Sequence, residues 1–175
     1  MMPYDSKTIN PRDEIVLIVD KDNTEAGTAP RHEMRARGLC HRASYILVFN
    51  SRGELFVQKR TMLKDIYPGY YDVAAGGVVL ADESYDESAR RELHEELGIQ
   101  NVSLAALFTF YYEEGKNKVW GRVYSCIHDG KLVLQAEEVA SGFFAFPEKV
   151  LQISAEEPFT PDGLYVLKRY LKEKV

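Results

Sequence analysis

The sequence predicts an α/β protein in which a mixed β-sheet lies between helices, with a short β/α extension at the N-terminus. Runs of β-branched and aromatic residues bounded by turns alternate with segments of helical periodicity. A helical segment in the middle of the chain and another at its end place helices on both sides of the strands. The length of 175 residues corresponds to one compact domain.

The first elements form the predicted extension, residues 1–38. Glu14 to Asp20 is an apolar run that ends in a turn-rich stretch, which indicates a strand. Thr28 is expected to cap a short helix with Pro30 in its first turn, and Gly38 is expected to end this helix.

The next strands surround a hairpin and a glycine pair. Ser44 to Phe49 and Leu55 to Gln58 read as strands joined by the turn Asn50–Gly53. Tyr71 to Ala75 is expected to be a short strand that leads directly into Gly76. The further expected strands are Val102 to Tyr112, Val119 to Ile127, Lys131 to Leu134 and Phe143 to Phe146.

Two segments show helical patterns with start signals. Ser84 and Glu87 fit a capping box, and Gly98 is the natural C-terminal stop. Thr160 and Pro161 open a C-terminal helix. Each helix has an apolar stripe that can pack on a sheet, formed by Ala89, Leu93 and Leu97 in the first and by Leu164, Leu167 and Leu171 in the second.

Glu92, Glu95 and Glu96 lie where an isolated helix tolerates them least. At about 100° per residue they share an arc of roughly 100°, and they occupy the last turn, where the helix dipole favours cations. Glu92 and Glu96 are also a like-charge i,i+4 pair, which costs about 0.2–0.5 kcal/mol. A divalent cation would reverse these penalties, because Mg²⁺ selects hard oxygen ligands. We therefore predict a metal site for Mg²⁺, with Mn²⁺ as the other candidate.

Two further features support this site. Gly77 would let the backbone before the helix approach a ligand closely. Arg91 is expected to pair with Glu83 and fix the loop that precedes the helix. Taken alone, Arg90 to Leu97 is also compatible with an ordinary solvated helix face.

The complete segment, residues 77–99, resembles the Nudix box at every defined position. The pattern is Gly, five residues, Glu, seven residues, Arg-Glu, an aliphatic residue, one residue, Glu-Glu, one residue, Gly and an aliphatic residue. At average residue usage its chance occurrence is well under roughly one in a million. The looser resemblance to a Nudix domain covers residues 39–172. Ala-Gly-Gly-Val-Val and Val-Trp-Gly make it similar to the YfcD-like bacterial group.

The resemblance implies a Nudix α/β/α sandwich and a magnesium-dependent hydrolase. Its substrate would be a nucleoside diphosphate linked to another group, or a related organic diphosphate. The metal set would be Glu92, Glu95 and Glu96 with Gly77, and the catalytic set would include Glu92, Glu95, Glu138 and Arg91. Glu83 and Gly98 would have structural roles. Glu95, Glu137 and Glu138 all remain candidates for the general base.

The N-terminal half, about Ile15 to Gly77, also resembles isopentenyl-diphosphate isomerase. Arg60 and Lys64 align with basic residues that those enzymes present to the diphosphate, so we expect them to bind substrate. The isomerase needs a Cys and a His where this chain has Ala75–Val78, and the position of one of its two upstream histidines holds Met34. We therefore expect no isomerase activity. An isomerase-like enzyme remains the alternative, as does a nucleotide-binding Nudix module without catalysis.

Composition limits the partners. The formal charge of −5 argues against binding to a nucleic-acid polymer or an anionic membrane. The sequence shows no transmembrane run and no secretory pattern, so we expect a cytoplasmic protein with Cys40 and Cys126 as reduced thiols. The expected partner is a small-molecule diphosphate, and the segment before Leu39 is a candidate dimer arm.

Overall fold

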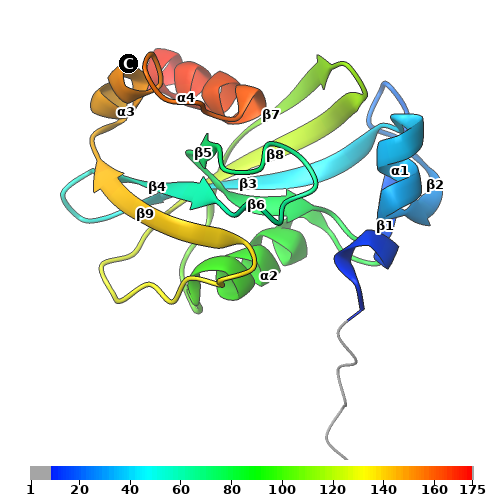
Figure 1. The fold of residues 1–175 in the computed structure, drawn as a ribbon, viewed down its shortest axis with the longest axis horizontal. Coiled ribbons are helices and arrows are strands. Elements are labelled where there is room, and N and C mark those ends of the chain that lie inside the picture. Colours follow the sequence, from blue (N-terminus) through cyan, green and yellow to red (C-terminus); the bar gives the residue numbers. More distant parts are fainter. Residues whose placement is uncertain (1–8, 175) are drawn as a thin grey trace, which may run out of the picture.

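Helices lie on both faces of a mixed β-sheet in the computed structural model, which describes residues 9–174 (Figure 1). The predicted fold class is therefore confirmed. The strands are β1 Ile15–Val19, β2 Glu25–Pro30, β3 His41–Phe49, β4 Leu55–Arg60, β5 Tyr71–Asp72, β6 Ala75–Val78, β7 Ala105–Glu114, β8 Asn117–Ile127 and β9 Val139–Ala145. The helices are α1 Arg31–Arg37, α2 Tyr85–Leu97, α3 Pro147–Ile153 and α4 Pro161–Glu173, and a 3-10 turn spans Pro11–Asp13.

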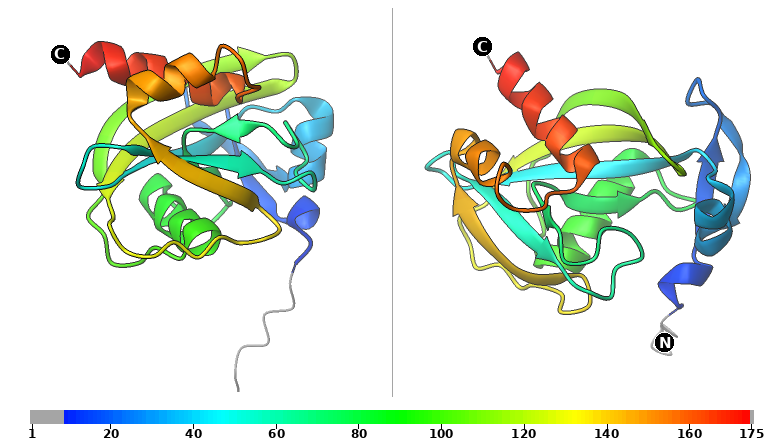
Figure 2. Two further views of the ribbon diagram at one scale, coloured as in Figure 1. Left: turned by 60° about the vertical axis from the view of Figure 1, so that its left-hand side comes forward. Right: turned by 45° about the horizontal axis from the view of Figure 1, so that its top comes forward.

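Strand β3 organises the sheet. It runs parallel to β8 and antiparallel to β1, β4 and β6. The register with β6 places Ser44 opposite Gly77 and Tyr45 opposite Gly76. Strand β7 extends the sheet beyond β8, and β9 pairs with β4 (Figure 2). The glycine pair thus lies against the central strand, where its backbone position is fixed.

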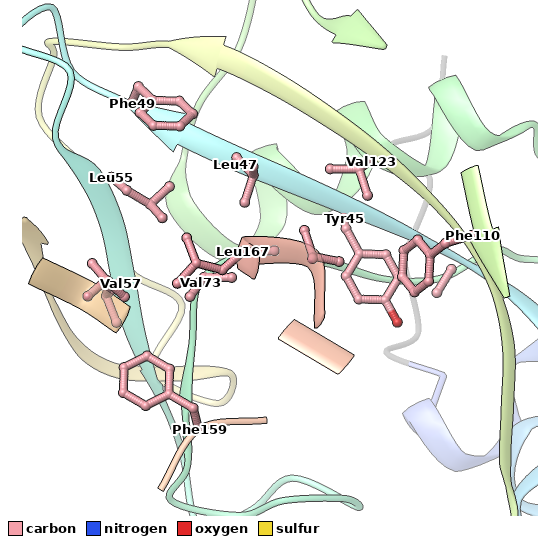
Figure 3. Close-up of a cluster of buried hydrophobic side chains, with 14 of the residues drawn as sticks. Tyr45, Leu47, Phe49, Leu55, Val57, Val73, Phe110, Val123, Phe159 and Leu167 are labelled. Carbon is pink, nitrogen blue, oxygen red and sulfur yellow. The ribbon is translucent and has the colours of Figure 1, made fainter. Parts of the chain in front are cut away.

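Apolar side chains cover both faces of the sheet. Successive side chains of β3 point to opposite faces. Tyr45 and Leu47 point toward the face covered by α4, where they join Phe110 and Leu167 (Figure 3). On the opposite face, Ile46 joins the core beneath α2. Helix α2 is therefore held against the sheet by its own apolar stripe, Ala89, Leu93 and Leu97, each of which is at most 1% exposed.

The N-terminal extension is joined to this sheet. Strand β1 pairs with β2 and meets β3 at Ile18 and His41. The prediction that Thr28 caps a helix is wrong, because Thr28 pairs with Leu17 in the β1–β2 ladder. The helix begins at Arg31, immediately after Pro30 ends the strand. Residues 1–8 of the predicted extension lie outside the described residues.

The segment around Asp72 differs from the prediction of one strand over Tyr71 to Ala75. The Asp72 carboxylate accepts a hydrogen bond from the backbone N–H of Ala74, which bends the chain between two short strands. Strand β5 pairs with β4, whereas β6 pairs with β3. At this bend the chain stops pairing with β4 and begins to pair with β3.

The predicted strand from Lys131 to Leu134 is also wrong. The N–H of Val133 donates to the carbonyl of Leu97, and that of Gln135 donates to the carbonyl of Glu96. These carbonyls have no partner within α2, because the last turn of a helix leaves its acceptors free. The segment caps the helix instead of extending the sheet.

Other helices and strands also differ from the prediction. The last strand, predicted over Phe143 to Phe146, begins earlier at Val139 and ends at Ala145. Helix α3 was not predicted: it is seven residues long and has no side-chain cap at Phe146, so it carries few local signals. No helix in residues 9–174 is long and apolar enough to cross a bilayer.

Candidate active site

Helix α2 is defined at both ends by its own residues. The Ser84 hydroxyl accepts from the N–H of Glu87, and the Glu87 carboxylate accepts from the N–H of Ser84, so the predicted capping box is present. Gly98 ends the helix in the left-handed conformation with φ of 68°. Local sequence therefore fixes the position of every side chain along this helix relative to the sheet.

The three glutamates of the predicted metal site have different environments. Glu96 is 4% exposed, and its carboxylate lies 3.4 Å from the N–H nitrogen of Gly76 and 3.5 Å from Nε2 of Gln58. The Glu92 side chain is 13% exposed, whereas that of Glu95 is 48% exposed. The helix thus places two carboxylates against the sheet and a third near solvent.

Arg91 connects these carboxylates to the preceding loop. Its guanidinium contacts Glu83 at 2.6 Å, as the sequence predicts, and also contacts Glu92 at 3.0 Å and Glu95 at 3.1 Å. Glu83 in turn accepts from the N–H of Leu80 at 2.9 Å. Arg91 therefore fixes the loop and the orientation of two glutamates together.

Burial leaves the inner carboxylates poorly solvated in their charged form. It raises the pKa of Glu92 to about 7, although the neighbouring Arg91 acts in the opposite direction. Burial and the Glu92 carboxylate raise the pKa of Glu96 well above its usual value. Two adjacent buried carboxylates repel each other when both are charged, and a divalent cation bound between them would remove this repulsion.

The donor set fits a hard divalent cation. Within residues 9–174 no three acidic, His or Cys side chains are grouped closely enough to hold a metal ion. The oxygen ligands that the helix presents here are the carboxylates of Glu92, Glu95 and Glu96, two of which contact Arg91. A Cβ at Gly77 would lie 2.4 Å from Oε1 of Glu92, so only glycine lets the backbone come this close to the carboxylate. Carboxylates next to a glycine backbone are suitable ligands for Mg²⁺ or Mn²⁺.

A cavity adjoins the glycine pair on the side of β4. Gly76 and Gly77 form part of its wall, and Arg60 and Lys64 enter from the end of β4 and the following loop. Arg60 donates to the carbonyl of Ile66 at 2.9 Å. The two basic residues predicted to bind substrate therefore line the cavity that adjoins the glycine pair.

The candidates for the general base are separated by the structure. Glu138 forms an ion pair with Lys64, and its charge contributes to the raised pKa of Glu96, so it lies near the inner carboxylates. The side chain of Glu137 is exposed, and only its backbone carbonyl is engaged, by Thr61. Glu95 contacts Arg91. Glu138 is therefore the candidate whose charge acts on the inner carboxylates, while Glu95 is held by Arg91 and Glu137 is exposed.

Sequence reasoning missed the contribution of helix α1. Arg31 and Arg35 line the same cavity as Arg60 and Lys64, and both contact Asp65 in the loop after β4. Their i,i+4 spacing on a predicted helix was the available signal, because it places two guanidiniums on one face.

An acidic pair on the cavity wall was missed as well. Asp72 lies 3.8 Å from Arg60, and Asp162 accepts from the Tyr45 hydroxyl at 2.7 Å. Burial, with Asp162 acting in the same direction, raises the pKa of Asp72 to about 6. These carboxylates come from β5 and from the start of α4, so only the folded chain brings them together.

Other conspicuous residues have structural positions. His41 is 2% exposed, and its burial lowers its pKa to about 3, whereas His32 is on the surface beside Asp13. Cys126 lies in the core beneath α2, where burial raises its pKa to about 11. Tyr111 packs on Trp120 with ring centroids 5.5 Å apart.

The α/β/α sandwich thus places buried carboxylates of one helix beside a cavity that is lined by four basic side chains. The NUDIX domain family matches residues 40–170 of this chain. The chain therefore belongs to the Nudix hydrolase family.

Close relatives and a solved structure agree with this assignment. The Nudix hydrolase PA4841 of Pseudomonas aeruginosa is 46% identical over 158 residues, which cover 90% of this chain and 94% of the relative. YfcD of Escherichia coli K12 is 45% identical over 159 residues, which cover 91% and 87%. The crystal structure of DR0079 from Deinococcus radiodurans has a TM-score of 0.80 and 26% identity, with coverage of 89% and 98%.

Proposed function

We propose that this chain hydrolyses the diphosphate bridge of a nucleoside diphosphate linked to another group, or of a related organic diphosphate. Nudix hydrolases generally act on nucleoside diphosphate derivatives and generally use divalent metal ions. The observation that carries the proposal is the position of Gly76 and Gly77. They lie between the buried carboxylates of Glu92 and Glu96 and a cavity lined by basic side chains.

The cofactor in this proposal is Mg²⁺ or Mn²⁺. Glu92, Glu95 and Glu96, with the backbone of Gly77, would hold it. When bound, such a cation neutralises phosphate charge and lowers the pKa of a bound water. Arg91 holds Glu92 and Glu95 in place and is a positioning residue, because its contacts in the structure are to carboxylates and to the backbone of Val78.

Arg60 and Lys64 bind the diphosphate in this scheme. Their side chains are each 13% exposed and therefore act in a lower effective dielectric than surface residues do. The guanidinium of Arg60 is already oriented by Ile66, which reduces the cost of ordering it around a phosphate. The water is deprotonated by Glu95 or by Glu138, and single Gln variants at these positions distinguish the two.

Product release from a panel of diphosphates tests the proposal. The panel contains a nucleoside diphosphate sugar, a dinucleoside diphosphate, a nucleoside triphosphate and isopentenyl diphosphate, each with Mg²⁺ and with a chelator. We expect metal-dependent cleavage of at least one compound, with ¹⁸O from labelled water in a phosphate product. Binding without turnover across the panel would instead support a nucleotide-binding module and overturn the proposal.

A further inference from the structure

The cavity beside Gly77 has a second set of cations, from the N-terminal helix α1. Arg31 and Arg35 lie one turn apart on α1, and they line the cavity together with Arg60 and Lys64. The two pairs come from segments separated by β3 and the β3–β4 turn. In the proposed function Arg60 and Lys64 bind the diphosphate bridge, which leaves the α1 pair for a different group.

The α1 arginines form ion pairs with acidic residues that do not line the cavity. Arg31 contacts Glu14 at 3.3 Å, and Arg35 contacts Asp65 at 3.3 Å. Their side chains are 17% and 20% exposed. The carboxylates that do line the cavity are those of Asp72 and Asp162, on the wall beside Arg60. The open space therefore faces more cations than carboxylates.

Two buried arginine nitrogens beside this cavity make no hydrogen bond within residues 9–174. Nε of Arg31 and Nε of Arg60 are buried and make no hydrogen bond to any described residue, although Nε of Arg31 lies 3.5 Å from Asp65. Buried N–H groups of charged side chains are rarely left unpaired. Both are in residues that line the open space. The guanidiniums of these two residues therefore have donor capacity left for a ligand with several acceptor oxygens.

The size of the cavity limits the ligand. Its volume is about 70 Å³. A cavity of about 150 Å³ is needed for a single benzene ring, and sites that enclose whole organic ligands have roughly 300–1,000 Å³. The space therefore admits phosphoryl groups and not a nucleobase, and Arg31, Arg35 and Lys64 also line an adjoining cavity of about 630 Å³ into which a chain of phosphoryl groups can extend. Among compact anions, a terminal phosphoryl group offers three oxygens to the guanidiniums of Arg31 and Arg35, whereas a carboxylate offers two.

We propose that Arg31 and Arg35 form a subsite for an additional phosphoryl group of the substrate, next to the diphosphate bound by Arg60 and Lys64. This inference rests on the proposed function for the position of the diphosphate. It assigns the N-terminal extension a direct role in substrate choice, because α1 supplies the subsite. The preferred substrates are then diphosphates that carry a further phosphoryl group, over those that end in a neutral group.

Binding of inorganic tripolyphosphate and pyrophosphate tests the subsite without turnover. Both are titrated calorimetrically in the presence of a chelator, into the full chain and into Arg35→Gln. We expect Arg35→Gln to weaken tripolyphosphate binding by about tenfold and pyrophosphate binding by less than about twofold. The matched control is Arg37→Gln, which removes an exposed arginine that pairs with Glu33 on the same helix. It should leave both affinities within about twofold.

Three results would overturn the subsite: equal losses for both anions in Arg35→Gln, equal effects in Arg37→Gln, or no tripolyphosphate binding by the unmodified protein. Arg31→Lys is the second variant, because it keeps the charge and removes the Nε donor. It should show an intermediate loss for tripolyphosphate alone. The result is independent of hydrolysis, so failure of the subsite and failure of the hydrolase assignment give different observations.

Discussion

The acidic and basic halves of the site are built in different ways. Helix α2 carries its carboxylates on one continuous element that is capped at both ends and packed on the sheet by a buried stripe. The basic half combines residues from α1, from the end of β4 and from the following loop, joined through ion pairs with Asp65 and Glu138. The first is fixed by packing and backbone hydrogen bonds, and the second by side-chain charge pairs.

This difference suggests a division of roles. Groups that stabilise charge at the reacting centre need a fixed geometry, which a packed helix provides. Groups that hold the remainder of the substrate can exchange one set of ion pairs for another when the ligand enters. We therefore expect changes in α2 to affect turnover and changes in the basic half to affect binding.

The largest effect is expected for Glu96→Gln. Loss of a carboxylate from the proposed metal set should lower kcat by about 10²–10⁴-fold and weaken Mg²⁺ binding. Stability should be unchanged or higher, because burial disfavours the charged form of Glu96. Hydrolysis rates, metal titrations and thermal unfolding measure these effects, with exposed Glu156→Gln as the control. Full metal-dependent turnover by the Glu96→Gln enzyme would show that α2 does not supply the metal site.

Gly77→Ala should be almost as damaging to activity. The new Cβ would lie 2.4 Å from Oε1 of Glu92, so either the carboxylate or the backbone must move. A displacement of this size at a reacting centre costs about 10²-fold in rate. Rate measurements with circular dichroism spectra as a folding check test this. At Gly53 a Cβ would meet no atom within 4 Å, but φ of 83° makes the substitution strained, so Gly53→Ala is the comparison for backbone strain far from the site. An active Gly77→Ala enzyme would show that the close approach is unnecessary.

The sequence was sufficient to locate α2 because its signals are local. Ser84, Glu87 and Gly98 act within one turn of the helix ends, so their pattern alone determines where the helix lies. The basic half could be predicted only in part. Arg60 and Lys64 were found through resemblance, whereas Arg31 reaches the cavity only because the β1–β2 hairpin joins the sheet beside β3.

The errors in the predicted fold have the same origin. Thr28 has the residue type of a helix cap, but pairing with Leu17 uses it in a strand. Lys131 to Leu134 has the apolar residues of a strand, but the free carbonyls of Leu97 and Glu96 accept from the N–H groups of Val133 and Gln135. In each case a partner distant in sequence overrides a local preference, and single-sequence patterns contain no information about that partner.

A smaller effect is expected on stability at the basic half. The pKa of Asp72 is raised to about 6 from a usual 3.8, mainly by burial. The folded state then binds this proton more tightly than the unfolded chain, so the stabilisation is complete below about pH 3.8 and is lost as pH rises through about 6.

Asp72→Asn should therefore raise the free energy of unfolding at pH 7–8, by on the order of 2–3 kcal/mol. The gain should disappear near pH 4. Denaturant unfolding across pH 4–8 measures this, with exposed Asp82→Asn as the control. A gain that does not vary with pH would contradict the raised pKa.

No effect is expected in an isomerase assay. The positions next to Gly77 hold Ala75 and Gly76, and neither cysteine is among the residues that line the cavity. Proton transfer across an allylic unit needs an acid–base pair at the substrate. Incubation of isopentenyl diphosphate in heavy water should give no deuterium incorporation, as followed by mass spectrometry. Incorporation at ordinary enzymatic rates would show that the N-terminal resemblance carries an activity.

The most direct test of the division of roles is a comparison of kcat and KM for Glu92→Gln and Arg60→Ala on one substrate. Glu92→Gln should lower kcat with little change in KM, because its contribution is largest where charge develops in the transition state. Arg60→Ala should raise KM more than it lowers kcat, because it removes binding shared by ground and transition states. The same kinetic signature in both variants would contradict the account.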